Sequence, residues 1–305
     1  MPALDTQTKV AVVGAGAMGS GIAQVAAQAG HQVYLHDQRE GAAEAGRDGI
    51  AKQLQRRVDK GKMQQQELDD VIGRIQPVAK LDQVADAGLV IEAIIEDLQI
   101  KRQLLANLED LCAGDAILAT NTSSISVTAL GAEMNKPERL VGMHFFNPAP
   151  LMALVEVVMG LATSKAVADT IHATATAWGK KPVYATSTPG FIVNRVARPF
   201  YAESLRLLQE QATDAATLDA IIREAGQFRM GAFELTDLIG HDVNYAVTNS
   251  VFNSYYQDPR FLPSLIQKEL VEAGRLGRKS GHGFYPYGEN AEKPQPKTEP
   301  AHQSD

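Results

Sequence analysis

The stretch "VAVVGAGAMGSG", from Val10 to Gly21, decides the fold class of this chain of 305 residues. Its apolar beginning predicts a short buried strand from Lys9 to Val13. Small residues from Ala17 to Ala29 predict a helix, and three glycines in G-x-G-x-x-G spacing span the junction. A strand, a glycine-rich turn and a helix in this order are typical of the first unit of a doubly wound sheet that binds a dinucleotide.

The three glycines suit a phosphate-binding turn for a physical reason. Gly14 permits a tight turn, Gly16 lets backbone N–H groups approach a pyrophosphate, and Gly19 allows the helix to pack close to the sheet. A glycine-rich core turn that binds no ligand is the alternative. The predicted cofactor-binding residues of this turn are Gly14, Gly16, Ala17, Met18 and Gly19.

Asp37 ends the second predicted strand, "HQVYLHD", at the distance from the glycines where dinucleotide sites carry an acid. A carboxylate there accepts hydrogen bonds from ribose hydroxyls and repels a 2′-phosphate, which favours NAD over NADP. Arg39 lies close by and weakens this preference slightly. An NAD site makes redox chemistry the leading class of function.

Strand and helix patterns alternate as far as "KPVYAT", which predicts a parallel, doubly wound sheet. After Ser187 only helical patterns follow, and Pro199 is expected to kink the first of them. We therefore expect an α/β fold with a Rossmann-type doubly wound sheet over residues 1–187 and an all-helical C-terminal domain over 188–287. The polar, proline-rich residues 288–305 predict a disordered tail. The expected C-terminal helices are Phe191–Gln211, Asp214–Ala225, Phe233–Tyr256 and Leu262–Ala273.

Composition narrows the classes of function further. A net charge of −7 argues against a broad nucleic-acid interface, which needs a basic face. The single cysteine, Cys112, excludes an intramolecular disulfide and a cysteine-based metal cluster, and it fits a reducing compartment. The apolar N-terminal run is interpreted as a strand, turn and helix rather than a signal or membrane segment. We expect a cytoplasmic protein with no membrane or nucleic-acid partner and no metal.

Further motifs carry a resemblance to a known family. Together with the glycine motif, "IEAIIEDLQIKRQL", "NTSSIS", "HFFNPAPLMALVEV" and "TPGFIVNR" resemble the NAD-dependent L-3-hydroxyacyl-CoA dehydrogenases. The match runs in order from about Lys9 to Tyr287. Within the family, "STPGFIVNRVARPFYAE" and "FLPSLIQKEL" are most similar to the bacterial branch that acts on 3-hydroxyadipyl-CoA in phenylacetate degradation. Members of that branch often run longer, with a second copy of the helical domain.

The resemblance implies oxidation of a (3S)-3-hydroxyacyl-CoA to the 3-oxoacyl-CoA. It maps the catalytic base onto His144, a residue type whose ordinary pKa suits proton transfer near neutrality, and its partner acid onto Glu156. Ser123 matches the serine that contacts the reacting oxygen, and Asn147 and Asn194 match asparagines that complete the pocket. From the residues alone, a structural histidine and an outward-facing strand glutamate remain alternatives.

Several ligand contacts follow from the resemblance or from charge. Further cofactor contacts map onto Glu96, Lys101 and Asn121. Coenzyme A carries phosphates, and we expect cations such as Arg56 and Lys60 to lie near them; a solvated helix face is the alternative.

The side chain at position 198 bears on the choice of acyl chain. Arg198 follows Asn194 by one helical turn, so it is a candidate for binding the distal carboxylate of 3-hydroxyadipyl-CoA. A surface ion pair with Glu203 is the alternative.

Two other functions remain open from the sequence. One is a catalytically weak, NAD-binding structural relative of the family. The other is a 3-hydroxyacid dehydrogenase acting on a substrate without coenzyme A, although such enzymes use a lysine rather than a His–Glu pair. The resemblance also implies a homodimer that pairs through the helical domain. Either the chain is a short form, or it is part of a longer protein.

Overall fold

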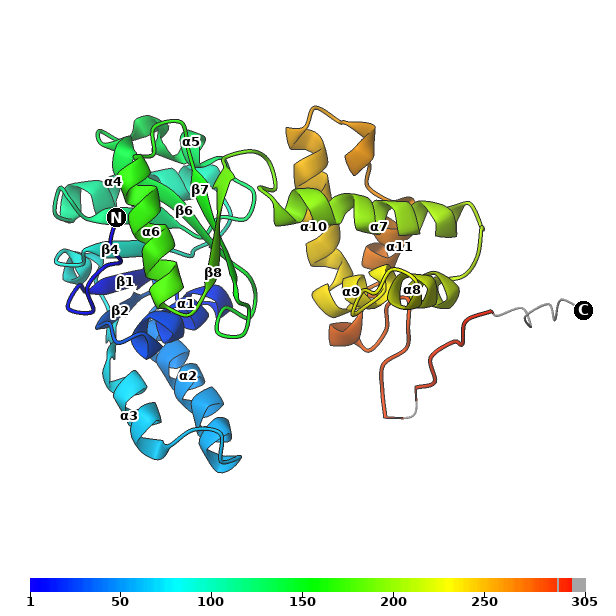
Figure 1. Cartoon of the computed structure of the whole chain (residues 1–305), viewed down its shortest axis with the longest axis horizontal. Coiled ribbons are helices and arrows are strands. Elements are labelled where there is room, and N and C mark those ends of the chain that lie inside the picture. The colour runs from blue at the N-terminus through cyan, green and yellow to red at the C-terminus, as the bar shows by residue number, and fades with distance from the viewer. Residues whose placement is uncertain (290, 298–305) are drawn as a thin grey trace, which may run out of the picture. The chain divides into compact units, whose positions relative to one another are not determined.

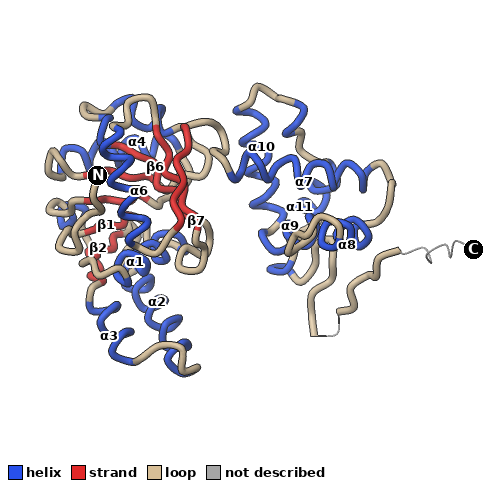
Figure 2. Tube along the Cα trace, in the orientation of Figure 1, coloured by secondary structure: helices blue, strands red, loops and turns tan. Residues whose placement is uncertain are grey.

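The structure is a computed structural model that describes residues 1–289 and 291–297. It divides into two compact units, Met1–Phe191 and the residues from Ile192 onward. Figure 1 shows their elements in chain order, and Figure 2 shows that the strands belong to the first unit and helices dominate the second. This division lies a few residues after the boundary that the sequence predicts near Ser187.

An eight-stranded sheet forms the centre of the N-terminal unit, with the strand order β3-β2-β1-β4-β5-β6-β7-β8. All neighbouring strands pair in parallel except β6 and β7, which are antiparallel. The strands are β1 (Val10–Val13), β2 (Val33–His36), β3 (Ile75–Val78), β4 (Leu89–Glu92), β5 (Ile117–Thr120), β6 (Leu140–Phe145), β7 (Leu154–Met159) and β8 (Lys181–Thr186).

Helices cover both faces of this sheet, as a doubly wound fold requires. In β1, Val10 and Val12 pack into the core beneath α1, α2, α3 and α6, whereas Ala11 and Val13 pack into the core beneath α4 and α5. The Rossmann-type sheet expected from the sequence is therefore confirmed. The helices are α1 (Ala17–Gln28), α2 (Ala42–Asp59), α3 (Gln65–Gly73), α4 (Leu98–Leu111), α5 (Val127–Leu130) and α6 (Lys165–Ala177).

Two features of the sheet differ from the sequence prediction. Strand β3 was not predicted; it lies at the sheet edge, where Pro77 is tolerated although it donates no hydrogen bond. The expectation of an entirely parallel sheet was wrong at β7. Only residues 146–153 connect β6 to β7, whereas a parallel return needs a dozen residues or more. The chain therefore turns back, and β7 pairs antiparallel with β6.

The C-terminal unit is helical, as expected. Its helices are α7 (Val193–Gln209), α8 (Ala215–Glu224), α9 (Ala232–Ile239), α10 (His241–Ser254) and α11 (Leu265–Glu272). Helix α7 continues through Pro199. The single helix predicted for Phe233–Tyr256 was wrong, because Gly240, with φ of 100° and ψ of 128°, ends α9 and starts α10. That conformation suits glycine and interrupts the helix.

The described part of the tail lies against the C-terminal unit. The Lys293 ammonium lies 3.6 Å from a Glu234 carboxylate oxygen, and the Lys297 N–H donates to the Thr217 hydroxyl at 2.8 Å. The predicted disorder of the tail also falls on residues 290 and 298–305, which lie outside the described residues. None of the helices in the described ranges is long and apolar enough to cross a membrane.

Candidate active site

The turn after β1 is built from glycines that tolerate no side chain at two positions. Gly14 has φ of 107° and its N–H donates to the His36 carbonyl at 2.7 Å; a Cβ there would lie 2.4 Å from the Ala93 oxygen. A Cβ at Gly19 would lie 1.7 Å from the Gly14 oxygen. At Gly16, by contrast, a Cβ would meet no atom within 4 Å.

The N-terminus of α1 is open to an anion. Gly16 is its N-cap, no side chain caps the helix, and its first turn holds no acidic residue. The first N–H groups of a helix have no partner within the helix, and the helix dipole favours negative charge there. This arrangement fits the pyrophosphate of a dinucleotide.

Asp37 lies directly after β2, beside this turn. Its carboxylate accepts hydrogen bonds from the Ala15 N–H at 2.8 Å and from the Arg39 N–H at 3.0 Å and Nε at 3.1 Å. Burial alone would raise the pKa of Asp37, but the hydrogen bonds from Arg39 and Ala15 outweigh it and lower the pKa to about 2. The group is therefore ionised at neutral pH, as a ribose-binding acid must be.

A cavity of about 380 Å³ opens between the ends of β1 and β2 and helix α4. Apolar side chains and amides suit a flat heteroaromatic ring such as adenine. The sequence reasoning missed this part of the site, because its residues come from several elements and follow no motif. They include Val13, His36, Gln38, Ile94, Leu104 and Asn107. With the glycine turn and Asp37, they fit NAD.

His144 and Glu156 are brought together by the pairing of β6 with β7. The two residues are direct cross-strand partners, and His144 Nδ1 lies 2.6 Å from Glu156 Oε2. Glu156 is 0% exposed and His144 is buried, so the outward-facing alternative for Glu156 is wrong. A carboxylate only accepts, so Nδ1 donates and Nε2 is left as the acceptor. The rings of Phe146 and Phe191 flank the imidazole, with centroids 4.5 Å and 5.7 Å away.

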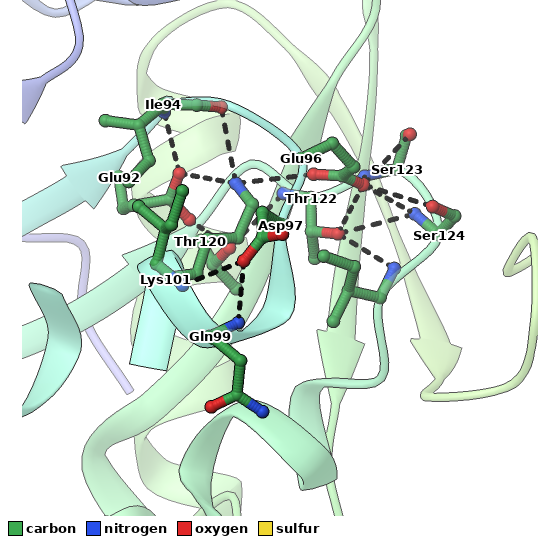
Figure 3. Close-up of polar contacts among 12 residues, drawn as sticks. Glu92, Ile94, Glu96, Asp97, Gln99, Lys101, Thr120, Thr122, Ser123 and Ser124 are labelled. Atoms are coloured by element: carbon green, nitrogen blue, oxygen red, sulfur yellow. Dashed lines mark hydrogen bonds and ion pairs between the residues drawn. The ribbon is translucent and has the colours of Figure 1, made fainter. Parts of the chain in front are cut away.

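Ser123 lies in a loop after β5 that is held by Glu96. Figure 3 shows the Glu96 carboxylate facing this loop, where it accepts hydrogen bonds from the Ser123 N–H at 2.9 Å and the Thr122 hydroxyl at 2.7 Å. Burial raises the pKa of Glu96, but the charge of Lys101 and the Thr122 hydroxyl more than offset this, so the pKa is lowered. Lys101 itself is 1% exposed and lies beneath Glu96, with its Nζ 2.5 Å from Glu92.

Two asparagines stand at neighbouring strand ends. Asn121 follows β5, and its side-chain oxygen accepts a hydrogen bond from the Phe145 N–H at 2.8 Å. Asn147 lies in the β6–β7 connection and lines a second cavity, of about 560 Å³, between α1 and α2. The buried Lys180 ammonium donates to the carbonyls of Ala149 at 2.6 Å and Met152 at 3.0 Å. Lys180 thus fixes this connection; no motif in the sequence indicated its role.

The remaining predicted side chains divide between α2 and α7. Arg56, in the last turn of α2, and Lys60, its C-cap, are exposed. Asn194 lies on α7. Arg198 is 4% exposed, and its guanidinium donates to the Asn244 carbonyl at 3.0 Å and the Thr248 hydroxyl at 2.8 Å. Burial lowers the pKa of Arg198.

The alternative of a surface ion pair between Arg198 and Glu203 is wrong. Arg198 is buried, and Glu203 pairs with Arg206 instead. Within residues 1–289 and 291–297, Arg198 has no carboxylate partner.

Comparison with known proteins places these features in one family. The pattern of the "3-hydroxyacyl-CoA dehydrogenase, NAD binding domain" matches residues 9–188, and that of the "3-hydroxyacyl-CoA dehydrogenase, C-terminal domain" matches residues 190–287. A 3-hydroxyadipyl-CoA dehydrogenase of Escherichia coli (strain K12) is 52% identical over 282 residues, which cover 92% of this chain and 59% of that protein. A probable 3-hydroxybutyryl-CoA dehydrogenase of Bacillus subtilis (strain 168) is 41% identical over 281 residues. The match covers 92% of this chain and 98% of that protein.

Solved structures agree with the sequence comparison. The crystal structure of a 3-hydroxybutyryl-CoA dehydrogenase from Escherichia coli K12 has a TM-score of 0.91 at 52% identity, covering 95% of this chain and 61% of that chain. A (S)-3-hydroxybutyryl-CoA dehydrogenase from Ralstonia eutropha has a TM-score of 0.88 at 35% identity, covering 93% of this chain and 100% of that chain. The resemblance drawn from the motifs is confirmed: this chain belongs to the 3-hydroxyacyl-CoA dehydrogenase family and carries its NAD-binding domain.

Proposed function

We propose that the chain catalyses the NAD-dependent oxidation of a (3S)-3-hydroxyacyl-CoA to the 3-oxoacyl-CoA. The observation that carries this proposal is the buried 2.6 Å contact between His144 and Glu156, at the same edge of the sheet as the dinucleotide-binding turn. Relatives with this reaction in their names support it. The chain spans 59% of the length of the Escherichia coli relative.

In the proposed mechanism, His144 removes the proton of the 3-hydroxyl through Nε2, because Nδ1 is engaged by Glu156. The carboxylate of Glu156 fixes the ring and stabilises the imidazolium that forms. Burial strengthens this interaction, since little water screens the two groups. Ser123 contacts the substrate oxygen. NAD held by the glycine turn and Asp37 would supply the acceptor for the hydride of C3.

A spectrophotometric assay of acetoacetyl-CoA reduction with NADH tests this proposal. The purified chain should consume NADH, and a His144→Ala variant should lose about 10²–10⁴-fold in turnover, the usual contribution of a positioned proton-transfer group. NADH should still bind to the variant, as measured by its fluorescence. Wild-type turnover in the variant would refute the role of His144, and absence of turnover in the wild type would favour a structural NAD-binding relative.

We propose that the phosphates of coenzyme A bind at the end of α2. The second cavity, which Gly16 and Ala17 line together with Asn147, belongs to the dinucleotide site described above. Arg56 and Lys60 are exposed in the last turn and at the C-cap of α2, so their cations are accessible to the phosphates of coenzyme A. Neither Arg56 nor Lys60 forms an ion pair with another of the described residues. The binding of a phosphate to them therefore breaks no such pair.

We propose 3-hydroxyadipyl-CoA as a substrate, on account of Arg198. A buried guanidinium without a carboxylate partner is costly, and a carboxylate on the substrate would compensate its charge. Its Nη1 donates to Asn244 and Thr248 and its Nε donates to the Asn194 carbonyl at 3.2 Å, which leaves Nη2 to pair with the carboxylate of the substrate. The identity of 52% to a 3-hydroxyadipyl-CoA dehydrogenase supports this choice, and 3-hydroxybutyryl-CoA is the alternative substrate.

We also propose that the chain forms a homodimer through its helical unit and acts in the cytoplasm. Several large apolar side chains of that unit are exposed, among them Ile221, Phe228, Leu238 and Leu265. Exposed apolar surface of this kind favours association. The single, buried Cys112 fits a reducing compartment. Light scattering that reports a monomer at micromolar concentration would count against the dimer.

A further inference from the structure

A buried lysine between two carboxylates lies beneath the Ser123 loop. Lys101, on the first turns of α4, is 1% exposed, and its ammonium lies 2.5 Å from Glu92 Oε1 and 3.3 Å from Glu96 Oε2. Glu92 is 0% exposed. Figure 3 shows Lys101 between the two acids, with Glu96 toward Ser123 and Ser124 and Glu92 on the opposite side. No part of Glu92 is open to a ligand.

Glu92 joins the ends of two neighbouring strands. It is the last residue of β4 and the register partner of Thr120, the last residue of β5. Its Oε2 accepts a hydrogen bond from the Thr120 hydroxyl at 2.6 Å, and its Oε1 accepts one from the Ile94 N–H at 2.7 Å. Glu92 is therefore held rigidly by the sheet, and it holds the Lys101 ammonium in turn.

Stability alone does not explain this arrangement. Burying an ammonium and a carboxylate costs several kcal/mol for each ion, and well-packed apolar residues often replace such a pair without loss of stability. What apolar residues cannot do is hold the second carboxylate. Lys101 contacts Glu96 as well as Glu92. Because Glu92 fixes the ammonium of Lys101, the positive charge of that ammonium determines where the Glu96 carboxylate lies.

Glu96 in turn organises the loop that carries Ser123. One oxygen, Oε1, accepts from the N–H groups of Ser123 at 2.9 Å and Ser124 at 3.2 Å. The hydroxyls of Thr122, Ser123 and Ser124 donate to the same oxygen at 2.7 Å, 3.3 Å and 3.1 Å. Charge-assisted hydrogen bonds of this kind are about twice as strong as neutral ones. The loop position therefore depends on Glu96 being ionised and fixed.

We propose that Glu92 is a positioning residue, which acts through Lys101 and Glu96 to place Ser123 against the reacting oxygen of the substrate. The inference rests on the proposed function, because it assumes that Ser123 contacts the substrate. Glu92 never touches substrate or cofactor. Its effect travels through two contacts, from the sheet to the ammonium and from the ammonium to the carboxylate that binds the loop.

A double-mutant cycle of Glu92→Gln and Ser123→Ala tests the inference. The substitution Glu92→Gln keeps the shape and removes the charge, so Lys101 shifts toward Glu96 and the loop moves. We expect kcat/KM for acetoacetyl-CoA reduction at saturating NADH to fall about 10- to 100-fold, the scale of a sub-ångström to ångström misplacement. In the Ser123→Ala background, the same change should cost no more than about 2-fold, because the residue it positions is gone.

Glu109, which lies on α4 with Lys101, provides a matched control for Glu92. Its carboxylate is also buried, and it accepts hydrogen bonds from the Asn135 N–H at 2.8 Å and the Lys136 N–H at 2.7 Å, away from the Ser123 loop. The Glu109→Gln variant should lose thermal stability yet keep the wild-type kcat/KM. If it lost as much activity as Glu92→Gln, the effect of Glu92 would be a general one of stability.

Each outcome of the cycle decides one question. If Glu92→Gln lowered kcat/KM by the same factor in the wild-type and in the Ser123→Ala background, the inference would be overturned. The proposed function would remain intact. Wild-type activity of Ser123→Ala alone would overturn the role of Ser123 in the proposed function, and the positioning inference with it. If Glu92→Gln does not fold, the isosteric Thr120→Val removes one hydrogen bond to Glu92, together with the longer one that the Thr120 hydroxyl accepts from the Thr122 N–H at 3.3 Å, and it should show the same coupling with a smaller loss.

Discussion

Replacing Asp37 by serine should move the enzyme from NAD toward NADP. Asp37 and Arg39 form one unit, in which the arginine is 74% exposed and its Nε and Nη2 donate to the carboxylate at 3.1 Å and 3.3 Å. The carboxylate that we assign to the ribose hydroxyls is therefore also hydrogen-bonded to the arginine. The substitution removes the ribose acceptor and frees a guanidinium at the place where a 2′-phosphate would lie.

The size of the effect follows from these two contacts. Losing hydrogen bonds to a charged acceptor costs about 1.5–3 kcal/mol for NAD, and a guanidinium–phosphate contact contributes a similar amount for NADP. The ratio of kcat/KM values for NAD and NADP should then change by about 10²–10⁴-fold, because each 1.4 kcal/mol is a factor of ten. Steady-state kinetics with both cofactors measure this ratio.

A second substitution separates the two contributions. Adding Arg39→Leu to Asp37→Ser should remove the gain with NADP while leaving the loss with NAD unchanged. A ratio that moves less than about 10-fold in Asp37→Ser would refute the assignment of Asp37 to the ribose. A gain with NADP that survives the loss of Arg39 would refute the part assigned to the arginine.

Other changes test the remaining contacts. The Arg198→Leu variant should lose about tenfold or more in kcat/KM toward 3-hydroxyadipyl-CoA and keep its value toward 3-hydroxybutyryl-CoA; equal losses would make Arg198 structural. Neutralising Arg56 and Lys60 together should raise the KM for acyl-CoA at low salt, and an unchanged KM would argue against their role. A Gly16→Val variant should fold normally, because its Cβ meets no atom within 4 Å, but it should fail to bind NADH in a fluorescence titration.

The depressed pKa of Asp37 predicts that stability depends on pH. Because the folded state favours the ionised carboxylate, stability should decrease as the pH falls. Its contribution is complete above the unfolded pKa of 3.8 and is lost as pH falls through about 2. Exposure of Arg39 limits it to about 1 kcal/mol or less. In the Asp37→Asn variant, the free energy of unfolding should therefore fall less between these pH values than in the wild type, as measured by urea denaturation.

The parts of the fold that were predicted correctly are those that a local sequence pattern determines. The glycine turn, the alternation of strands and helices and the helical C-terminal unit are each written in a continuous stretch, so they were predicted correctly. Strand β3 was missed because four residues containing Pro77 make a weak strand pattern. The helix break at Gly240 was missed because an isolated glycine inside an apolar pattern often continues a helix.

The site was predictable only where a motif named its residues. The roles proposed for His144, Glu156 and Ser123 come from the family resemblance, and the structure shows the first two residues in contact. Glu92 and Lys180 were not singled out, although both fix loops of the site. Their importance lies in contacts with residues distant in sequence, such as Thr120 and Ala149, which no spacing rule reveals.

The antiparallel pairing of β6 with β7 has a consequence for how this site can change over evolutionary time. His144 and Glu156 face each other because two adjacent strands are in register, not because a mobile loop brings them together. A slip of the pairing by one residue would turn Glu156 to the opposite face and destroy the sheet core with it. The contact between these two side chains is thus inherited with the fold, and descendants of such a chain lose it by replacing a side chain rather than by gradual drift of the backbone.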